Sequence, residues 1–150
     1  MLGRAYTIQT KQTFSTAITA LEVTAGAGQA FEILRAWVSN TSVTTSAQCD
    51  VALLRKTATI TGTALSPAAV ELGAGGDTSF AGSAKHTATA EGTDGDILFA
   101  DGMNSLNGWF YLPTPEERET VPAGGLIAIK FITAPTSASY RVGIRVRELG

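Results

Sequence analysis

The last part of the chain, residues 140–149, alternates strictly between apolar and polar side chains. The apolar positions are Tyr140, Val142, Ile144 and Val146. Because successive side chains of a β-strand point to opposite faces of a sheet, this pattern predicts a strand that is buried on one side only. Arg141, Arg145 and Arg147 occupy the other side, so the exposed face is expected to carry a basic stripe.

Further segments show short runs of β-branched or aromatic residues, separated by Gly, Pro, Asn, Asp and Ser. We expect strands at residues 5–10, 14–23, 31–39, 48–56, 69–72, 84–90, 97–100, 108–112 and 126–133. No stretch repeats apolar residues at i, i+3, i+4 and i+7 over three turns, so no helix is expected. About ten short strands without intervening helices predict an all-β sandwich or barrel.

Glycine-rich segments separate several of the predicted strands, at residues 25–28, 73–77 and 92–96. The dipeptide Asn107-Gly108 predicts a type I′ turn, because both residues tolerate positive φ angles. Two longer segments, residues 73–85 and 113–125, are expected to be irregular. The second begins with Pro113, which cannot donate a hydrogen bond within a sheet, and loops of this length are often functional.

Two predicted strands carry apolar residues on both faces. In residues 31–38, one face has Phe31, Ile33 and Trp37, and the other has Leu34, Ala36 and Val38. In residues 126–132, Ile127, Ile129 and Phe131 oppose Leu126, Ala128 and Ile132. Antiparallel sheets usually leave one face to water, so the second face should be covered by a loop or by another subunit. The second alternative is the residue-level argument for an oligomer.

Length and composition favour one domain spanning residues 1–150, which needs neither a disulfide nor a metal to fold. Charged residues make up 16% of the chain, below the roughly 25% usual for soluble domains, and the net charge is −2. This balance provides no overall attraction to nucleic acid. The lone cysteine, Cys49, excludes an internal disulfide and is expected to be buried in a strand.

The first residues lack the apolar core of a signal peptide, and no segment has the about 18 consecutive apolar residues of a membrane span. We therefore expect synthesis in the cytoplasm without secretion, and no association with a membrane.

Catalytic arrangements are weakly supported. His86 is the only histidine, and no serine lies in a Gly-x-Ser-x-Gly motif, so a Ser-His-acid triad is not expected. Glycoside hydrolysis needs two carboxyl groups across a cleft. Glu116, Glu117 and Glu119 are the best candidates for it, and they are better interpreted as a solvated loop. The sequence therefore predicts a protein that is not an enzyme.

Metal and cofactor sites are also not expected. One histidine and one cysteine without ligand spacing do not make a zinc site. Asp94, Asp96 and Asp101 could approach one another for calcium, but the twelve-residue calcium loop is absent and Asp-Gly pairs mainly form turns. The glycines at 73–76 lack the following helix of a phosphate-binding loop.

Two features are candidates for binding. Alternation places Trp109 and Tyr111 on one face of a strand, and Phe110 and Leu112 on the other. One pair should be core, and the other could stack on a sugar or anchor a protein interface. The second feature is the basic stripe, which could follow an acidic partner surface, or pair with acids on neighbouring strands and discourage edge aggregation.

Several segments together resemble a known group of proteins. They are Arg4-Ala5-Tyr6-Thr7, the run from Leu34 to Asn40, the run from Val51 to Arg55 with a turn at 62–65, Asn107-Gly108-Trp109, the run from Val121 to Leu126, and the ending Arg147-Glu148-Leu149-Gly150. In these the chain resembles small virion structural proteins of tailed bacteriophages, regarded as capsid decoration, cement or head-fibre-type jelly-roll proteins. The resemblance covers nearly the whole chain.

The resemblance implies a jelly-roll sandwich, homotrimeric or pseudo-threefold assembly, and no catalytic residues. We therefore expect a non-enzymatic structural protein of the virion that decorates or cements the capsid by contacts with itself and with the major capsid protein. The expected contact residues are Trp37, Trp109, Tyr111, Arg141, Arg145 and Arg147. The alternative is a carbohydrate-binding module or receptor-binding tip that uses Trp109 or Tyr111 with the loop at 113–125, and a hydrolase ranks third.

Overall fold

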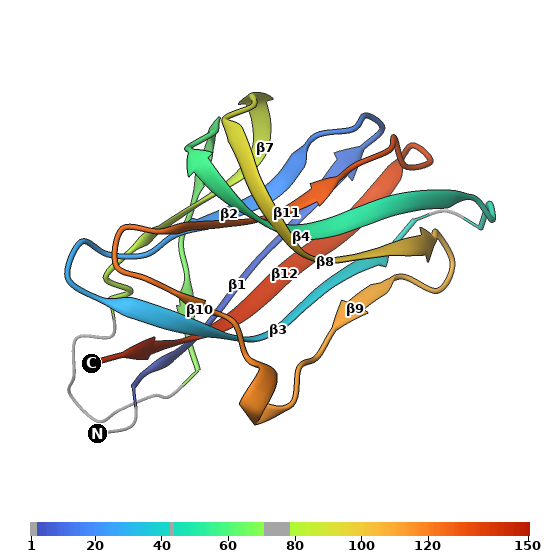
Figure 1. Cartoon of the computed structure of the whole chain (residues 1–150). Coiled ribbons are helices and arrows are strands. Elements are labelled where there is room, and N and C mark those ends of the chain that lie inside the picture. Colours follow the sequence, from blue (N-terminus) through green and yellow to red (C-terminus); the bar gives the residue numbers. More distant parts are fainter. Residues whose placement is uncertain (1–2, 43, 71–78) are drawn as a thin grey trace.

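The computed structural model describes residues 3–42, 44–70 and 79–150. Within these ranges the chain forms twelve strands in two antiparallel sheets that pack face to face (Figure 1). This confirms the all-β sandwich expected from the sequence. The described residues contain no helix long and apolar enough to cross a membrane.

In chain order, the elements are β1 (Ala5–Phe14), β2 (Thr19–Thr24), β3 (Ala30–Asn40), β4 (Gln48–Ala58), β5 (Thr61–Leu65), β6 (Ala68–Ala69), β7 (Ser83–Ala90), β8 (Thr93–Asn104), β9 (Trp109–Tyr111), the short 3₁₀ turn η1 (Pro115–Glu117), β10 (Thr120–Val121), β11 (Leu126–Phe131) and β12 (Ala138–Leu149). The first sheet has the order β10-β3-β12-β1-β6, with β9 also paired to β3. The second sheet has the order β5-β7-β2-β11-β4-β8.

The jelly roll is visible in the order of eight of these strands. One sheet contains β1-β12-β3-β9, and the facing sheet contains β2-β11-β4-β8. The consecutive pairs β1/β2, β3/β4, β8/β9 and β11/β12 therefore occupy matching positions in the two sheets, and the last strand returns between the first and the third. This is a double-sheet jelly roll with short additional strands at its edges.

The core lies between the two sheets and follows the predicted alternation. On β12, Tyr140, Val142, Ile144 and Val146 are all buried, as the sequence predicts. From the facing sheet, Phe131 packs on Tyr140, with ring centroids 5.5 Å apart, and on Phe14 of β1, at 5.3 Å. Each such fully buried large side chain stabilises the fold by about 1.5–3 kcal/mol through its removal from water.

Several strand boundaries differ from the predictions. β1 extends to Phe14, and β2 begins only at Thr19, so residues 15–18 are not in a strand. The predicted strand at 14–23 is therefore divided between β1 and β2. Residues 62–65, expected as a turn, belong to β5, which pairs with β7. Residues 93–104 form one long strand that includes the Asp-Gly pairs, because pairing with β4 outweighs their turn preference. The predictions at 69–72 and 73–85 fall partly on residues 71–78, outside the described residues.

The apparent double-sided apolar face of β3 comes from a β-bulge. The register with β12 shifts between Arg145/Arg35 and Val146/Ile33, so Leu34 is the extra residue. Phe31 and Ile33 before the bulge, and Ala36 and Val38 after it, all point into the core. Trp37 consequently lies on the outer face, and β3 does not need a second subunit to cover it.

The second apolar face of β11 is covered by the chain itself. Ala52, Leu54 and Ala128 form a small buried cluster on the outer side of the second sheet. The connection from β4 to β5 folds over this side, where the backbone N–H of Ile60 and the hydroxyl of Thr59 donate to the buried carboxylate of Glu22. Of the two alternatives for β11, the covering loop is therefore the one observed.

The Asn107-Gly108 turn is not the predicted type I′ turn. Gly108 has φ of 75°, but no positive φ is found at Asn107. Instead the Asn104 carbonyl accepts hydrogen bonds from the N–H groups of both residues, each at 3.0 Å. A side chain at position 108 would meet the Val38 carbonyl at 2.6 Å, so glycine is required both for its φ and for the close approach of β9 to β3.

Candidate binding surfaces

The described residues contain no group of three or more His, Cys, Asp or Glu side chains placed to hold a metal ion. His86 shares a hydrogen bond with the Thr87 hydroxyl at 3.0 Å, and burial lowers the pKa of its ring. Cys49 is buried as expected, and burial, together with the charge of Asp50, raises the pKa of its thiol. These groups do not assemble into a reactive cluster in the described part of the chain.

Asp94 lies in an ionic cluster at the outer side of the second sheet. The buried Lys56 ammonium donates to Glu91 at 3.1 Å and to Asp94 at 2.7 Å, and Lys130 also pairs with Asp94. Burial alone would raise the pKa of Asp94 and of Glu91, but the hydrogen bonds that each receives outweigh it and lower both. The cluster therefore stays charged at neutral pH, and its geometry is that of a structural ion-pair network.

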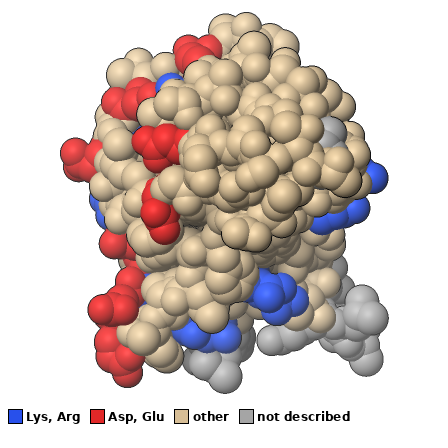
Figure 2. Space-filling model, turned by 90° about the vertical axis from the view of Figure 1, so that its right-hand side faces the viewer, with Lys and Arg blue, Asp and Glu red and all other residues tan. Residues whose placement is uncertain are grey.

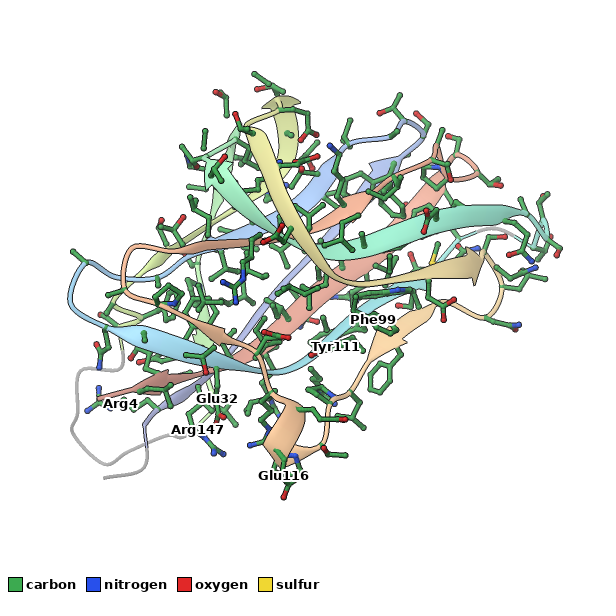
Figure 3. The ribbon with its side chains drawn as sticks, in the orientation of Figure 1. Arg4, Glu32, Phe99, Tyr111, Glu116 and Arg147 are labelled. Atoms are coloured by element: carbon green, nitrogen blue, oxygen red, sulfur yellow. The ribbon has the colours of Figure 1, made fainter. Side chains whose placement is uncertain are left out.

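The aromatic pair of β9 that faces inward is Trp109 and Tyr111. Trp109 is only 4% exposed, and its ring packs on Phe99 of β8 with the two centroids 5.7 Å apart. The Tyr111 ring packs on the same Phe99 ring at 5.1 Å (Figure 3). Trp109, and to a lesser extent Tyr111, therefore belong to the packing between the sheets rather than to the exposed surface on which we expected them. Phe110 and Leu112, which are 54% and 65% exposed, take that place.

Apolar side chains line a hollow between the edge strands β8 and β9. The hollow measures about 500 Å³ and is lined by Leu98, Phe99, Phe110, Tyr111, Leu112, Pro113 and Glu117. We call it the β8–β9 groove. It lies between β8, which pairs only with β4, and β9, which pairs only with β3, so both are edge strands of their sheets. Part of the predicted loop at 113–125 therefore forms one wall of a surface groove.

The basic stripe of β12 lies on the outer face of the first sheet, as the sequence predicts. Arg147 pairs with Glu32 of β3 at 3.2 Å (Figure 3). Arg145 donates from Nε to the Thr7 hydroxyl of β1, also at 3.2 Å. One of the two expectations for the stripe was that its arginines pair with acids on neighbouring strands. Among the three arginines this holds for Arg147 alone. No ion pair to Arg141 or Arg145 occurs within the described residues.

Trp37 lies at the centre of this face, on β3. Its indole ring covers Gly143 so closely that a Cβ atom there would lie 2.2 Å from the ring. The Arg35 guanidinium carbon is 5.0 Å from the centroid of the same ring, a distance that favours a cation–π contact. Absence of a side chain at position 143 is what allows the indole to lie flat on the sheet.

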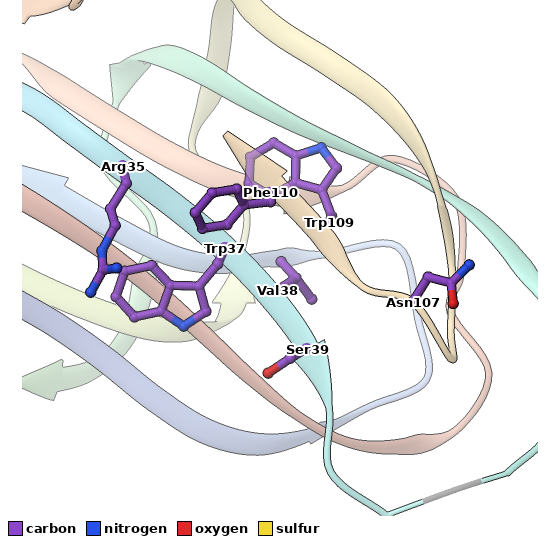
Figure 4. A pocket seen from close by; sticks show the side chains of 7 residues that line it. All are labelled: Arg35, Trp37, Val38, Ser39, Asn107, Trp109 and Phe110. Carbon is purple, nitrogen blue, oxygen red and sulfur yellow. The ribbon is translucent and has the colours of Figure 1, made fainter. Parts of the chain in front are cut away.

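A second hollow, of about 510 Å³, opens beside Trp37 (Figure 4). Its walls are Arg35, Trp37, Val38, Ser39, Asn107, Trp109 and Phe110. We call it the Trp37 hollow. It offers the partly buried ring of Trp37 and the exposed ring of Phe110 together with a guanidinium, a hydroxyl and an amide, so it combines stacking surfaces with hydrogen-bonding groups.

Charge is distributed unevenly over the molecule. Figure 2 shows acidic side chains gathered along one edge of the molecule, at the left of the view, whereas most of the Lys and Arg visible there lie lower and to the right. The outer face of the first sheet contains Lys11, Arg35, Arg141, Arg145 and Arg147. Opposing them on its strands is Glu32, which contacts Arg147 and Arg118.

Sequence reasoning did not name Lys11 or Arg35 as residues of these sites, and it left open whether Phe110 and Leu112 or the other aromatic pair would lie on the surface. The pairing of Trp37 with Phe110 and with Gly143 across strands needs the register, which no local pattern contains. A scan against protein-family models, a search of curated proteins and a search of solved structures each found no match to this chain.

Proposed function

We propose that the chain is a non-enzymatic structural component of a bacteriophage particle, which decorates or cements the capsid through multivalent protein–protein contacts. The virion location and the expected partners, copies of the same chain and the major capsid protein, rest on the sequence resemblance described above. The jelly-roll strand order agrees with what that resemblance implies. Many copies on a particle make weak individual contacts sufficient, because avidity multiplies them.

The observation that carries this proposal is the β8–β9 groove. Phe110 and Leu112 expose more than half of their surfaces, beside the partly buried Phe99 and Tyr111. Large apolar side chains exposed next to each other favour protein association, and aromatic residues are enriched in the centre of protein interfaces. We therefore assign the contact with a neighbouring subunit or capsid protein to this groove, rather than to Trp109.

We expect the purified chain to self-associate, with a trimer as the expected state, and Leu112→Ser to shift it toward the monomer. Removing the most exposed apolar side chain of the groove lowers the apolar area buried by a partner, and the expected loss of affinity is about tenfold. Light scattering over a range of concentrations measures the mass of both proteins. Val70→Ser, which alters an exposed valine after β6, is the matched control and should leave the association unchanged.

A wild-type chain that stays monomeric at all concentrations would contradict self-association through the groove. The location is tested separately. Particles purified from cells that encode the chain should contain it in a fixed ratio to the major capsid protein, by quantitative mass spectrometry. Its absence from such particles would contradict the virion proposal.

A further inference from the structure

Four cationic side chains on the outer face of the first sheet form two cross-strand pairs of like charge. In the strand register, Arg145 of β12 lies directly opposite Arg35 of β3, and Arg141 lies directly opposite Lys11 of β1. Like charges at directly opposite positions of an antiparallel pair destabilise a sheet. Two such pairs flank the Trp37–Gly143 pair on either side.

These cations lack the acidic partners that other cations of the chain have. Arg55, Lys56, Arg118, Lys130 and Arg147 each contact a carboxylate. Within the described residues, no ion pair involves Lys11, Arg35, Arg141 or Arg145. The Nε of Arg35 is in addition shielded from solvent without a hydrogen-bond acceptor. The Nε atoms of Arg55 and Arg118 are in the same state although both side chains contact a carboxylate, so it is the missing acidic partner that distinguishes Arg35.

The Trp37 hollow adjoins this cationic group. Arg35 belongs to both, because it lines the hollow and contacts the Trp37 ring. The rings of Trp37 and Phe110 come from adjacent strands at opposite register positions, and Ser39 and Asn107 add a hydroxyl and an amide. A hollow of about 510 Å³ is within the range of about 300–1,000 Å³ of small-molecule sites.

We propose that the Trp37 hollow binds a saccharide that carries an anionic group. The apolar face of a sugar ring packs on Trp37 and Phe110, while Asn107 and Ser39 bind its hydroxyl groups. The carboxylate or sulfate of the sugar is bound by Arg35 in the bidentate geometry that guanidinium groups favour, and Arg145, opposite Arg35 in the strand register, adds its positive charge. The electrostatic cost of placing the two arginines opposite each other is thereby offset in the complex.

The shape of the site favours a saccharide over an acidic protein segment. Its stacking surfaces and polar groups converge in one hollow of ligand size, whereas an extended peptide would need a continuous row of partners along the sheet. The assignment is independent of the virion proposal, because the β8–β9 groove is a separate hollow that shares only Phe110 with it.

Binding is tested by titration calorimetry and by chemical-shift perturbation with sialyllactose and an oligogalacturonate as carboxylated probes, a heparin tetrasaccharide as the sulfated probe, and lactose as the neutral control. We expect at least one acidic probe to bind at least about tenfold more tightly than lactose, and the affinity to fall as salt is added. Preference for carboxylated or sulfated probes identifies the anionic group.

Trp37→Ala is expected to reduce the affinity at least about tenfold through loss of stacking, and Arg35→Thr and Arg145→Thr to remove the preference for the acidic probe. Each arginine variant relieves the repulsion between Arg35 and Arg145 but loses a contact, with the Trp37 ring or with Thr7, so its thermal midpoint should stay within about 3 °C of wild type, whereas loss of a residue essential to the fold would lower it further. Arg55→Thr is the matched control and should bind like wild type. Arg55 lies on β4 of the second sheet and pairs with Glu119.

No binding of any acidic probe would overturn the proposal, and so would binding that Trp37→Ala leaves unchanged. An oligoglutamate peptide is included as a competitor. If it binds as tightly as the best saccharide and independently of Trp37, the basic face is a docking site for an acidic protein and the saccharide assignment is wrong.

Discussion

Trp109→Ala is expected to lower the free energy of unfolding by about 3–5 kcal/mol, the range for removing a large aromatic side chain from a core. The indole is 4% exposed and packs on Phe99, and it fills the space between the edge strands of the two sheets. Truncation leaves a cavity there that the edge strand β9 is too short to close. Urea or thermal unfolding followed by fluorescence and circular dichroism measures the change.

Phe110→Ala is the matched control for this variant, because the next residue along the same strand is an aromatic that points outward. Its expected effect on stability is within about 0.5 kcal/mol. If Trp109→Ala instead leaves stability unchanged and alters only association, the side chain is a contact residue, and its placement in the core is wrong.

Glu91→Ala is expected to lower the free energy of unfolding by about 2–4 kcal/mol. The carboxylate accepts from the buried Thr19 N–H at 2.5 Å, from the Thr19 hydroxyl at 2.6 Å and from Lys56 at 3.1 Å. Its loss leaves a buried N–H without an acceptor and the Lys56 ammonium with one carboxylate fewer. The estimate lies below the usual range for a fully buried pair, because Glu91 is partly solvated. Glu116→Ala, on the exposed η1 turn, is the control.

The same cluster predicts the acid sensitivity of the fold. The pKa values of Glu91 and Asp94 are lower in the folded chain than in the unfolded chain, so the unfolded chain binds protons first as the pH falls. Their stabilisation is fully present above the ordinary carboxylate pKa of about 4 and is lost as the pH falls through the lowered values. Stability measured from pH 7 to pH 2 should therefore decline less steeply in Glu91→Ala. An equally steep decline would mean that Glu91 does not contribute to the acid sensitivity.

The candidate sites illustrate where sequence patterns stop being informative. Alternation correctly predicted that Trp109 and Tyr111 share one face of β9, and that Phe110 and Leu112 share the other. It did not indicate which face is inside, because both pairs are apolar. That choice depends on Phe99, which lies on β8 of the facing sheet and contacts Trp109 and Tyr111 only once the two sheets pack together.

The sequence by itself determined the all-β class, the buried and basic faces of β12 and most of the strands, because each follows from a period of two within one segment. Only the tertiary structure decided the remaining features. The bulge at Leu34 turned Trp37 outward, the β4–β5 connection covered the second sheet, and the register placed Arg35 opposite Arg145. All of these depend on pairing between residues far apart in the chain, whose energies no single segment contains.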